Sequence, residues 1–312
     1  MHLKVLTLKG IKLKEKVLKR NMNGSRKKRL VTFTVIVFLL GLCNAFGQNY
    51  RIAYDYVFKK DSTDINSIDK EIMFLDTNKG GSVFYSYPKF MYDSLTADRY
   101  HKNKYSGDID FSNISDKSKI AFSVEKKYAD NEVVLNTILG IQKYTVVDDT
   151  PIKWQIVPER NTYKEFNVQK AVCDFGGRKW IAWYTTDIPL LDGPYKFWGL
   201  PGLILKIEDT KKDHVFEFMG IQKMQSTESY FYQIYKPEKE KISNKQFNLL
   251  WKEYKKDPGK NSKMLLYNSG TDMKISWNGR ELNKSEMIRN VEKNAQQNLI
   301  RNNNFLEISL YK

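Results

Sequence analysis

Few side chains of this chain are of types that could carry out catalysis. Cys173 is the only cysteine after residue 47, and a thiol nucleophile would need a base, for which the same region offers His101 and His214. The surrounding residues VQKAVCDF are typical of a strand interior, which indicates a buried thiol. Metalloprotease, serine-hydrolase, phosphate-loop and C-x-x-C patterns have no match in the sequence. Two histidines and one cysteine make no recognisable zinc site, so we expect no metal and no cofactor.

Two weaker patterns also have structural explanations. Residues 86–89 spell S-x-x-K, a spacing that works only on a helical turn, and Pro88 disfavours a helical backbone for the residue before it. We therefore expect no serine–lysine pair. Three aspartates could suggest calcium, but their spacing lacks the glycine and the final glutamate of an EF-hand loop, which favours a solvated acidic loop. These aspartates are Asp108, Asp110 and Asp116.

A cluster of aromatic side chains is the remaining candidate for chemistry or binding. It is accompanied by Asp187, Lys196 and Asp209, a combination that could line a pocket for an apolar or carbohydrate-like ligand. The alternative is that the rings fill the core and cover one end of a sheet, with the cations paired to nearby acids. The candidate ligand-binding residues are Arg178, Trp180, Trp183, Tyr184, Tyr195 and Trp198.

The cluster is followed by a Pro-Gly turn in the hexapeptide GLPGLI, residues 199–204. Proline restricts Leu200 to an extended backbone, Pro201 presets its own φ, and Gly202 can adopt a positive φ. We expect a type II turn that starts a strand at Leu203. Gly199, Pro201 and Gly202 are therefore assigned as structural turn residues.

The elements that must position these side chains are mostly strands. Alternating or apolar runs bounded by turn residues predict antiparallel pairing, with hairpin turns at residues 78–81 and 176–177. Residues 90–105 have a looser, helical pattern. The expected strands are residues 50–58, 71–75, 82–86, 119–125, 144–147, 153–157, 166–175, 179–186, 203–208 and 215–219.

Beyond residue 235 the composition favours helices. Ser243 is a candidate N-cap for a helix over 246–255, and Asn283 and Glu286 have capping-box spacing for a helix over 283–301. One or two further strands are expected within 263–277. We predict a mainly β (α+β) fold, a curved antiparallel sheet or half-open barrel with C-terminal helices packed on it. Residues 48–312 form one domain, with a β core at 48–235 and a helix-containing part at 236–312.

The first 47 residues are predicted to be a signal peptide with an extended basic n-region. Four basic residues at 26–29 precede an apolar run at 30–46, and small residues at 45 and 47 form a cleavage pattern before Gln48. Translation could start at Met1 or at Met22. A retained membrane anchor or a lipoprotein at Cys43 is the alternative, although Leu42 is a poor match for lipoprotein processing.

The leader also explains most of the basic charge. The chain carries 52 basic and 36 acidic residues, and residues 1–47 hold 11 of the basic residues and a single acid. The remaining 41 basic and 35 acidic residues leave a charge of +6, with no basic stripe typical of nucleic-acid binding. We expect no nucleic-acid partner, and no transmembrane segment after signal cleavage.

Residues 175–209, FGGRKWIAWYTTDIPLLDGPYKFWGLPGLILKIED, resemble the diagnostic segment of the GLPGLI family, secreted proteins of Gram-negative bacteria whose function is uncharacterised. Further similarity lies at KWQ (residues 153–155), at Lys170-Ala171 and in the tail, where three asparagines precede Leu306-Glu307. One departure is residues 166–168, where a Gly-aromatic pair is expected. The resemblance implies export and a shared domain, and it supplies no catalytic residues.

The sequence therefore predicts an exported protein of the periplasm or outer envelope, or one that is secreted. We expect a non-enzymatic module that binds an apolar or carbohydrate-like ligand or an envelope protein partner. The alternative is a secreted hydrolase whose active site follows no known pattern. A contact between Cys173 and His214 in a cleft would favour the hydrolase.

Overall fold

The computed structural model describes residues 49–105, 113–148, 150–224, 241–268, 275–277 and 280–312. These residues belong to one compact unit, Gln48–Lys312. The predicted signal peptide, residues 1–47, lies outside the described residues.

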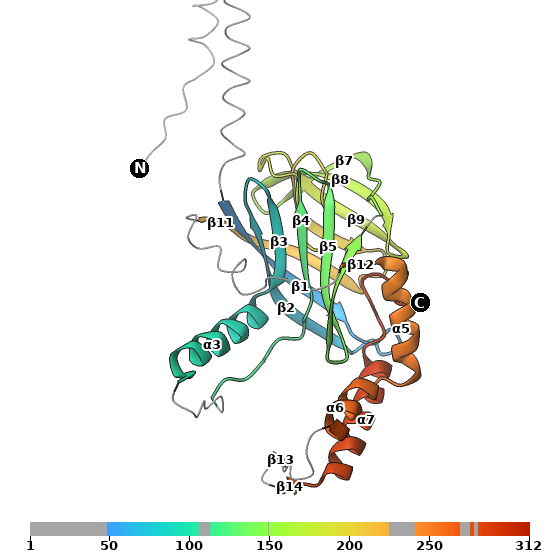
Figure 1. Cartoon of the computed structure of the whole chain (residues 1–312). Helices are drawn as coiled ribbons and strands as arrows, with labels where there is room; N and C mark the ends of the chain where they lie inside the picture. Colours follow the sequence, from blue (N-terminus) through green and yellow to red (C-terminus); the bar gives the residue numbers. More distant parts are fainter. Residues whose placement is uncertain (1–48, 106–112, 149, 225–240, 269–274, 278–279) are drawn as a thin grey trace, which may run out of the picture. The chain divides into compact units, whose positions relative to one another are not determined.

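A single large sheet dominates this unit (Figure 1). Its 12 strands run in the order β12-β6-β5-β4-β3-β2-β1-β11-β10-β9-β8-β7, and the order does not close. All neighbouring strands are antiparallel except the short β12, which is parallel to β6. The strands are β1 Asn49–Lys59, β2 Ile68–Thr77, β3 Gly81–Ser86, β4 Ser123–Lys127, β5 Glu132–Leu139, β6 Gln142–Asp148, β7 Gln155–Tyr163, β8 Phe166–Phe175, β9 Arg178–Thr185, β10 Leu203–Asp209, β11 His214–Met224 and β12 Lys241–Ser243.

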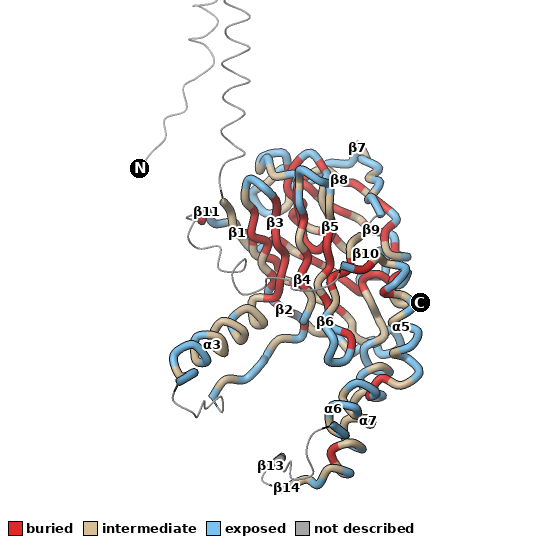
Figure 2. The backbone as a smooth tube through the Cα atoms, viewed as in Figure 1, coloured by how far each residue is buried: buried red, intermediate tan, exposed pale blue. Residues whose placement is uncertain are grey.

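The sheet curves so that its two halves share one core. Buried residues run along the strands (Figure 2), and one hydrophobic cluster joins Val124 and Leu135 on one half to Ala171 and Trp180 on the other. The hydroxyl of Tyr54 on β1 donates to the carbonyl of Ile204 on β10, over 2.8 Å. The predicted curved, mainly antiparallel fold is confirmed, and the sheet is open.

Most strands lie where the sequence pattern predicts them. In β1, every second residue from Ile52 to Phe58 is buried, which is the alternation of a half-buried strand. Residues 166–168, which depart from the family pattern, pair with residues 161–163 of β7. From Gln169 on, β8 pairs regularly with β9 up to the Gly176-Gly177 turn. The sequence interpretation missed β5, whose EVVLNTIL is apolar on both faces and lacks a period of two.

The first described helix, α3 (Tyr87–Asn103), starts earlier than predicted. Ser86 is its N-cap and accepts a hydrogen bond from the amide of Lys89, 3.1 Å away. Pro88 lies in the first turn, where its missing N–H would have no intrahelical partner, so proline is favourable there. The expectation that Pro88 prevents a helical turn at this point was wrong.

The C-terminal helices are α5 (Asn244–Lys256), α6 (Lys260–Asn268) and α7 (Lys284–Arg301). Ser243 is the N-cap of α5 as predicted, and with Gln246 it forms a capping box that was not predicted. The capping box predicted at Asn283 and Glu286 is present at the start of α7. α5 packs on the sheet through Phe247, whose ring lies against Tyr144 of β6, whereas α6 and α7 pack against each other. Residues 263–277 hold most of α6 and one strand of the short hairpin β13 (Ile275–Trp277) and β14 (Arg280–Leu282), so the prediction of strands there was right only in part.

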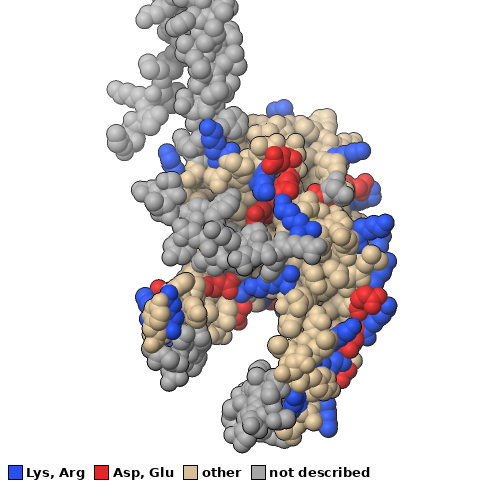
Figure 3. Space-filling view, viewed as in Figure 1, with Lys and Arg blue, Asp and Glu red and all other residues tan. Residues whose placement is uncertain are grey.

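No helix in the described ranges is both long and apolar enough to cross a membrane. On the face drawn in Figure 3, lysine and arginine side chains lie beside aspartate and glutamate side chains. The charges that remain after the leader is set aside are thus mixed in sign on this face.

Candidate functional site

A cavity of about 210 Å³ lies inside the curve of the sheet. Its walls combine side chains of β1, β5 and β11 with residues of the C-terminus. Six aromatic side chains are among its lining residues, together with His214, Glu307 and three lysines. The lining residues are Tyr56, Phe58, Lys59, Lys60, Lys119, Ile120, Phe122, Leu135, Tyr195, His214, Asn302, Asn304, Phe305, Leu306, Glu307 and Tyr311.

One wall is the C-terminal strap, which we define as residues 302–312. Its backbone is tied at both ends of the curve: the amides of Asn303 and Asn304 donate to the carbonyl of Lys60, and the amide of Ser309 donates to the carbonyl of Gly176. Leu306, between these hydrogen bonds, and Leu310, just after them, are buried in the core. The strap is therefore part of the folded domain and covers the cavity.

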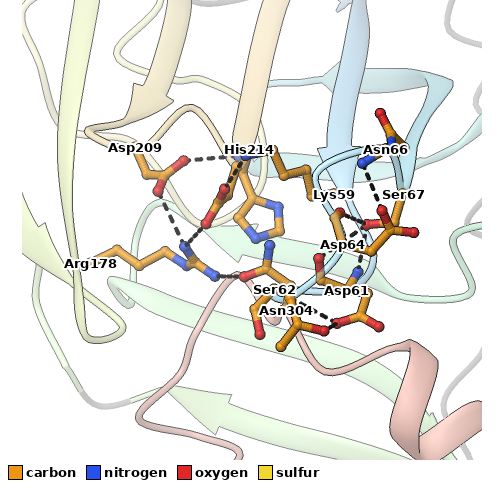
Figure 4. A network of polar contacts seen from close by, with 12 residues as sticks. Lys59, Asp61, Ser62, Asp64, Asn66, Ser67, Arg178, Asp209, His214 and Asn304 are labelled. Carbon is orange, nitrogen blue, oxygen red and sulfur yellow. Dashed lines mark hydrogen bonds and ion pairs between the residues drawn. The ribbon is translucent and has the colours of Figure 1, made fainter.

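Arg178, at the start of β9, anchors the strap (Figure 4). Its Nε and Nη2 donate to the carbonyl of Phe305 over 2.9 and 2.7 Å, and Nη2 also donates to Oδ1 of Asn304 over 2.6 Å. Nη1 forms ion pairs with Asp209 (3.2 Å) and Asp213 (3.5 Å). The guanidinium is almost fully buried. Its N–H donors point in several directions in one plane, so it contacts the end of β10, the residue before β11 and the strap at the same time.

His214, the first residue of β11, is buried against the cavity. Its Nδ1 lies 2.8 Å from the hydroxyl of Tyr56, and its backbone amide donates to Asp209. Burial, and to a lesser extent the positive charge of Arg178, lower the pKa of His214 to about 3. The imidazole is therefore neutral at physiological pH, and its Nε2 has no hydrogen-bond partner among the described residues.

A second buried network holds the strap from the other side. Lys196 Nζ contacts Asp148 (2.8 Å) and Glu307 (2.5 Å), and the hydroxyl of Tyr195 donates to the same Glu307. Burial alone would lower the pKa of Lys196, but the two carboxylates raise it. Tyr195 adopts a positive φ of 54°, an uncommon backbone conformation for an aromatic residue.

The loop between β9 and β10 is fixed by a buried ion pair. Lys126 Nζ on β4 contacts Asp192 Oδ1 (2.5 Å) and the carbonyl of Gly193 (2.7 Å), and the hydroxyl of Tyr128 donates to Asp192 Oδ2. Both side chains of the ion pair are buried. This contact across the curve places the loop that carries Tyr195 and Lys196.

The structure separates the predicted ligand-binding residues. Among them, Tyr195 lines the cavity and Arg178 holds its strap. Trp180 is in the core, where its Nε1 donates to Phe175. The ammonium group of Lys170 lies over the ring of Trp183, and the hydroxyl of Tyr184 donates a hydrogen bond to Gln169. The ring of Trp198 stacks on that of Tyr128. Their role in ligand binding stays a prediction.

The Pro-Gly turn differs from the type II turn that we expected. The amide of Gly202 donates to the carbonyl of Leu200, and the amide of Leu203 donates to Ile188. Gly202 has a φ of 154°, far from the value of about 80° at this position of a type II turn. A Cβ at Gly202 would lie 2.0 Å from the carbonyl oxygen of Thr185, so the close approach of two backbones requires glycine here.

The other sequence candidates have structural partners. Cys173 lies in β8, and burial raises the pKa of its thiol to about 12. Ser86 Oγ donates to Glu71, and Lys89 Nζ pairs with Asp93, so the two side chains do not form a catalytic pair. Asp108 and Asp110 lie outside the described residues, while Asp116 accepts from Ser118. Within the described ranges no group of three or more potential ligands could hold a metal.

The sequence interpretation missed four residues of the cavity: Tyr56, His214, Asn304 and Glu307. Tyr56 was recognised only as part of a strand, and His214 only as a base for Cys173. The asparagines and Glu307 entered through the family resemblance of the tail, without a role. No spacing signal joins these positions, because Tyr56, His214 and the C-terminal pair lie far apart in the sequence.

The comparisons with known proteins do not assign a function. The sequence model of a family described as "Protein of unknown function (Porph_ging)" matches residues 140–206, a span that includes the GLPGLI turn. The predicted likeness to an uncharacterised family is thus confirmed over this segment. No curated protein matches the chain.

Among solved structures, PNGF-II in its C2 and P21 crystal forms is similar to 63% of this chain, with 19% and 18% sequence identity and a TM-score of 0.42 for both. The similar region spans 31% of each PNGF-II chain.

Proposed function

We propose that this chain is an exported protein of the cell envelope that binds a small, largely apolar molecule in the cavity of its sheet and performs no reaction on it. The observation that carries the proposal is the cavity itself, about 210 Å³ in volume, lined by six aromatic side chains among others and covered by the C-terminal strap. Small-molecule sites are typically concave, apolar and provided with a few placed polar groups. The cavity is smaller than the range of about 300–1,000 Å³ of drug-sized sites, which favours a compact ligand.

Binding is better supported than hydrolysis by the polar groups at the cavity. His214, with a pKa of about 3, is a weak base at neutral pH, and general-base catalysis favours a pKa near the working pH. Glu307 is engaged by Lys196 and Tyr195. A thiol with a pKa of about 12, such as Cys173, is almost entirely protonated, and a thiolate is the nucleophilic form.

The proposal of export rests on the leader. The basic residues at 26–29, the apolar run at 30–46 and the small residues before Gln48 fit a cleaved signal peptide. The GLPGLI resemblance supports the same location, the periplasm or outer envelope. A single cysteine after the cleavage site is compatible with an oxidising compartment, because no intrachain disulfide is needed.

A titration with toluene, followed by methyl NMR, tests the binding function. Leu135 and Ile120 line the cavity, so their methyl shifts should change saturably, whereas the exposed Ile156 on β7 should not respond. Leu135→Phe fills the cavity and should abolish the response. Ile138→Phe, on the same strand but partly exposed outside the cavity, is the matched control and should preserve it. Equal responses in both variants, or none in the wild type, would refute the proposed site.

A further inference from the structure

We propose that an open cleft between α5 and the C-terminal strap binds a phosphate monoester of a small hydroxylated molecule, such as a sugar phosphate. The cleft has a volume of about 430 Å³ and lies where the C-terminus runs beside α5 (Figure 1). The only lining residue that it shares with the cavity inside the curve of the sheet is Glu307. The proposal therefore adds a second site to the function proposed above and does not depend on it.

Three lysines supply the positive charge of the cleft: Lys245, Lys252 and Lys312. All three residues are exposed, so their ammonium groups can reach a ligand. None of them forms an ion pair with a carboxylate of the described residues, whereas the buried Lys126 and Lys196 are held by such pairs. Lysine binds phosphate as a point charge. Three unpaired cations around one cleft therefore favour a ligand that carries two negative charges.

Two of these lysines lie on one face of α5. Lys245, Asn248 and Lys252 are three and four residues apart, a spacing that places side chains on the same side of a helix. The buried side chains of the helix are Phe247 and Trp251. The first turn of α5 holds Lys245 and no acidic residue. A cation is unfavourable there, because the backbone N–H groups of a helix N-terminus carry partial positive charge, and a bound anion would offset this cost.

Hydrogen bonds within the chain hold the walls of the cleft together. Nδ2 of Asn248 donates to the backbone oxygens of Leu310 and Lys312 over 3.3 and 3.1 Å, which joins α5 to the strap. The amide of Ser309 donates to the carbonyl of Gly176 over 3.0 Å, which joins the strap to the turn between β8 and β9. The cleft is thus formed before a ligand binds, and a preformed site lowers the entropic cost of binding.

The other polar groups of the cleft favour a hydroxylated ligand. The hydroxyls of Thr150 and Ser309 belong to exposed lining residues and have no hydrogen-bond partner among the described residues. A hydroxyl can donate to a phosphate oxygen or exchange hydrogen bonds with a sugar hydroxyl. Glu307, the acidic side chain among the lining residues, is already held by Lys196 and Tyr195. The volume lies within the range of about 300–1,000 Å³ of small-molecule sites.

A titration of the mature chain with glucose 6-phosphate, followed by NMR, tests the proposal. The backbone amide shifts of Gly176, Asn248 and Ser309 should change saturably, whereas the methyl shifts of Leu135 in the other cavity should not. Glucose 6-phosphate should bind at least tenfold more tightly than glucose. Its affinity should fall at least threefold between about 20 and about 300 mM NaCl, because salt screens exposed charges. Equal affinities for the two sugars, or shifts confined to other parts of the chain, would overturn the proposal.

A pair of double variants separates this site from a general effect of charge. Lys245→Gln/Lys252→Gln should bind glucose 6-phosphate at least tenfold less tightly than the wild type. Lys255→Gln/Lys256→Gln is the matched control, because it removes the same charge from the same helix at positions that do not line the cleft. It should keep the wild-type affinity to within about twofold. All four lysines are exposed, so both variants should fold. Equal losses in both would show a response to net charge alone and overturn the proposal.

A lipid headgroup is the other source of a phosphate monoester. Cosedimentation with phosphatidylcholine vesicles, with and without phosphatidic acid, distinguishes the two sources. The proposal predicts that glucose 6-phosphate displaces the chain from any vesicles with phosphatidic acid that it binds. Cosedimentation that depends on Lys245 and Lys252 and resists saturating glucose 6-phosphate would assign these lysines to a membrane surface and overturn the small-molecule site.

Discussion

At the scale of residues, burial and hydrogen bonds fix the states of the groups that face the cavity. Sequence spacing directed attention to Arg178 and Tyr195, because they belong to a dense local cluster. It could not bring Tyr56 and His214 together, since they are 158 positions apart and meet only because β1 pairs with β11. Local chemistry was thus predictable, and the site that depends on strand pairing was not.

The neutral state of His214 predicts a pH dependence of stability. The folded chain holds the pKa near 3, whereas the unfolded chain has the ordinary value of about 6.5. Between these values the unfolded state binds more protons, so the free energy of unfolding should fall as the pH drops, by up to about 1.4 kcal/mol per pH unit. Thermal unfolding from pH 7 to pH 4 should show a steeper loss in the wild type than in His214→Gln. Equal slopes would contradict the assignment.

The close approach at Gly202 predicts a large loss of stability for a small substitution. Gly202→Ala would place its methyl group 2.0 Å from the carbonyl oxygen of Thr185 and should destabilise the chain by about 3 kcal/mol.

Gly199→Ala is the control for this prediction. Gly199 also has a positive φ, but a Cβ at this position would have no atom within 4 Å, so the cost should be only about 1 kcal/mol of backbone strain. Urea unfolding compares the two variants. A larger loss at Gly199 would contradict the role assigned to Gly202.

At the scale of elements, the sequence was most informative where each element has one buried face. The alternation of β1 and the N-cap residue of α5, Ser243, predicted both elements to within a few residues. The strand β5 was missed because apolar residues lie on both of its faces and hide the alternation, and the helix α6 was missed because it has no buried residue. The strap has no regular secondary structure at all, so its position depends on Arg178 and Lys196.

Loss of Arg178 should release the strap. Arg178→Met removes the donors to Phe305 and Asn304 and leaves Asp209 without its cation, which should cost about 3–5 kcal/mol. Hydrogen exchange of the Asn303, Asn304 and Ser309 amides should become faster than that of β1. Lys179→Met is the matched control at the next residue, because its ion pair with Asp174 is exposed, and it should change stability by less than about 0.5 kcal/mol. Unchanged exchange in Arg178→Met would show that the strap does not depend on this anchor.

At the scale of the whole molecule, the series of short strands joined by turns was enough to predict a curved antiparallel sheet. Strand order was not predictable, because it depends on contacts such as Lys126 with Asp192 across the curve. The same curvature produces the cavity, so the sequence could not show that the domain contains one. The curved sheet supplies apolar walls of this cavity, and the C-terminal strap, residues 302–312, forms another wall.

The most direct test is native mass spectrometry of the protein isolated from the envelope of its own cells. The wild-type chain should begin at Gln48 and carry one small, largely apolar molecule, which Leu135→Phe should lose and Ile138→Phe should keep. A ligand-free wild-type chain, or a chain that retains residues 1–47 in the cytosol, would contradict the central claim.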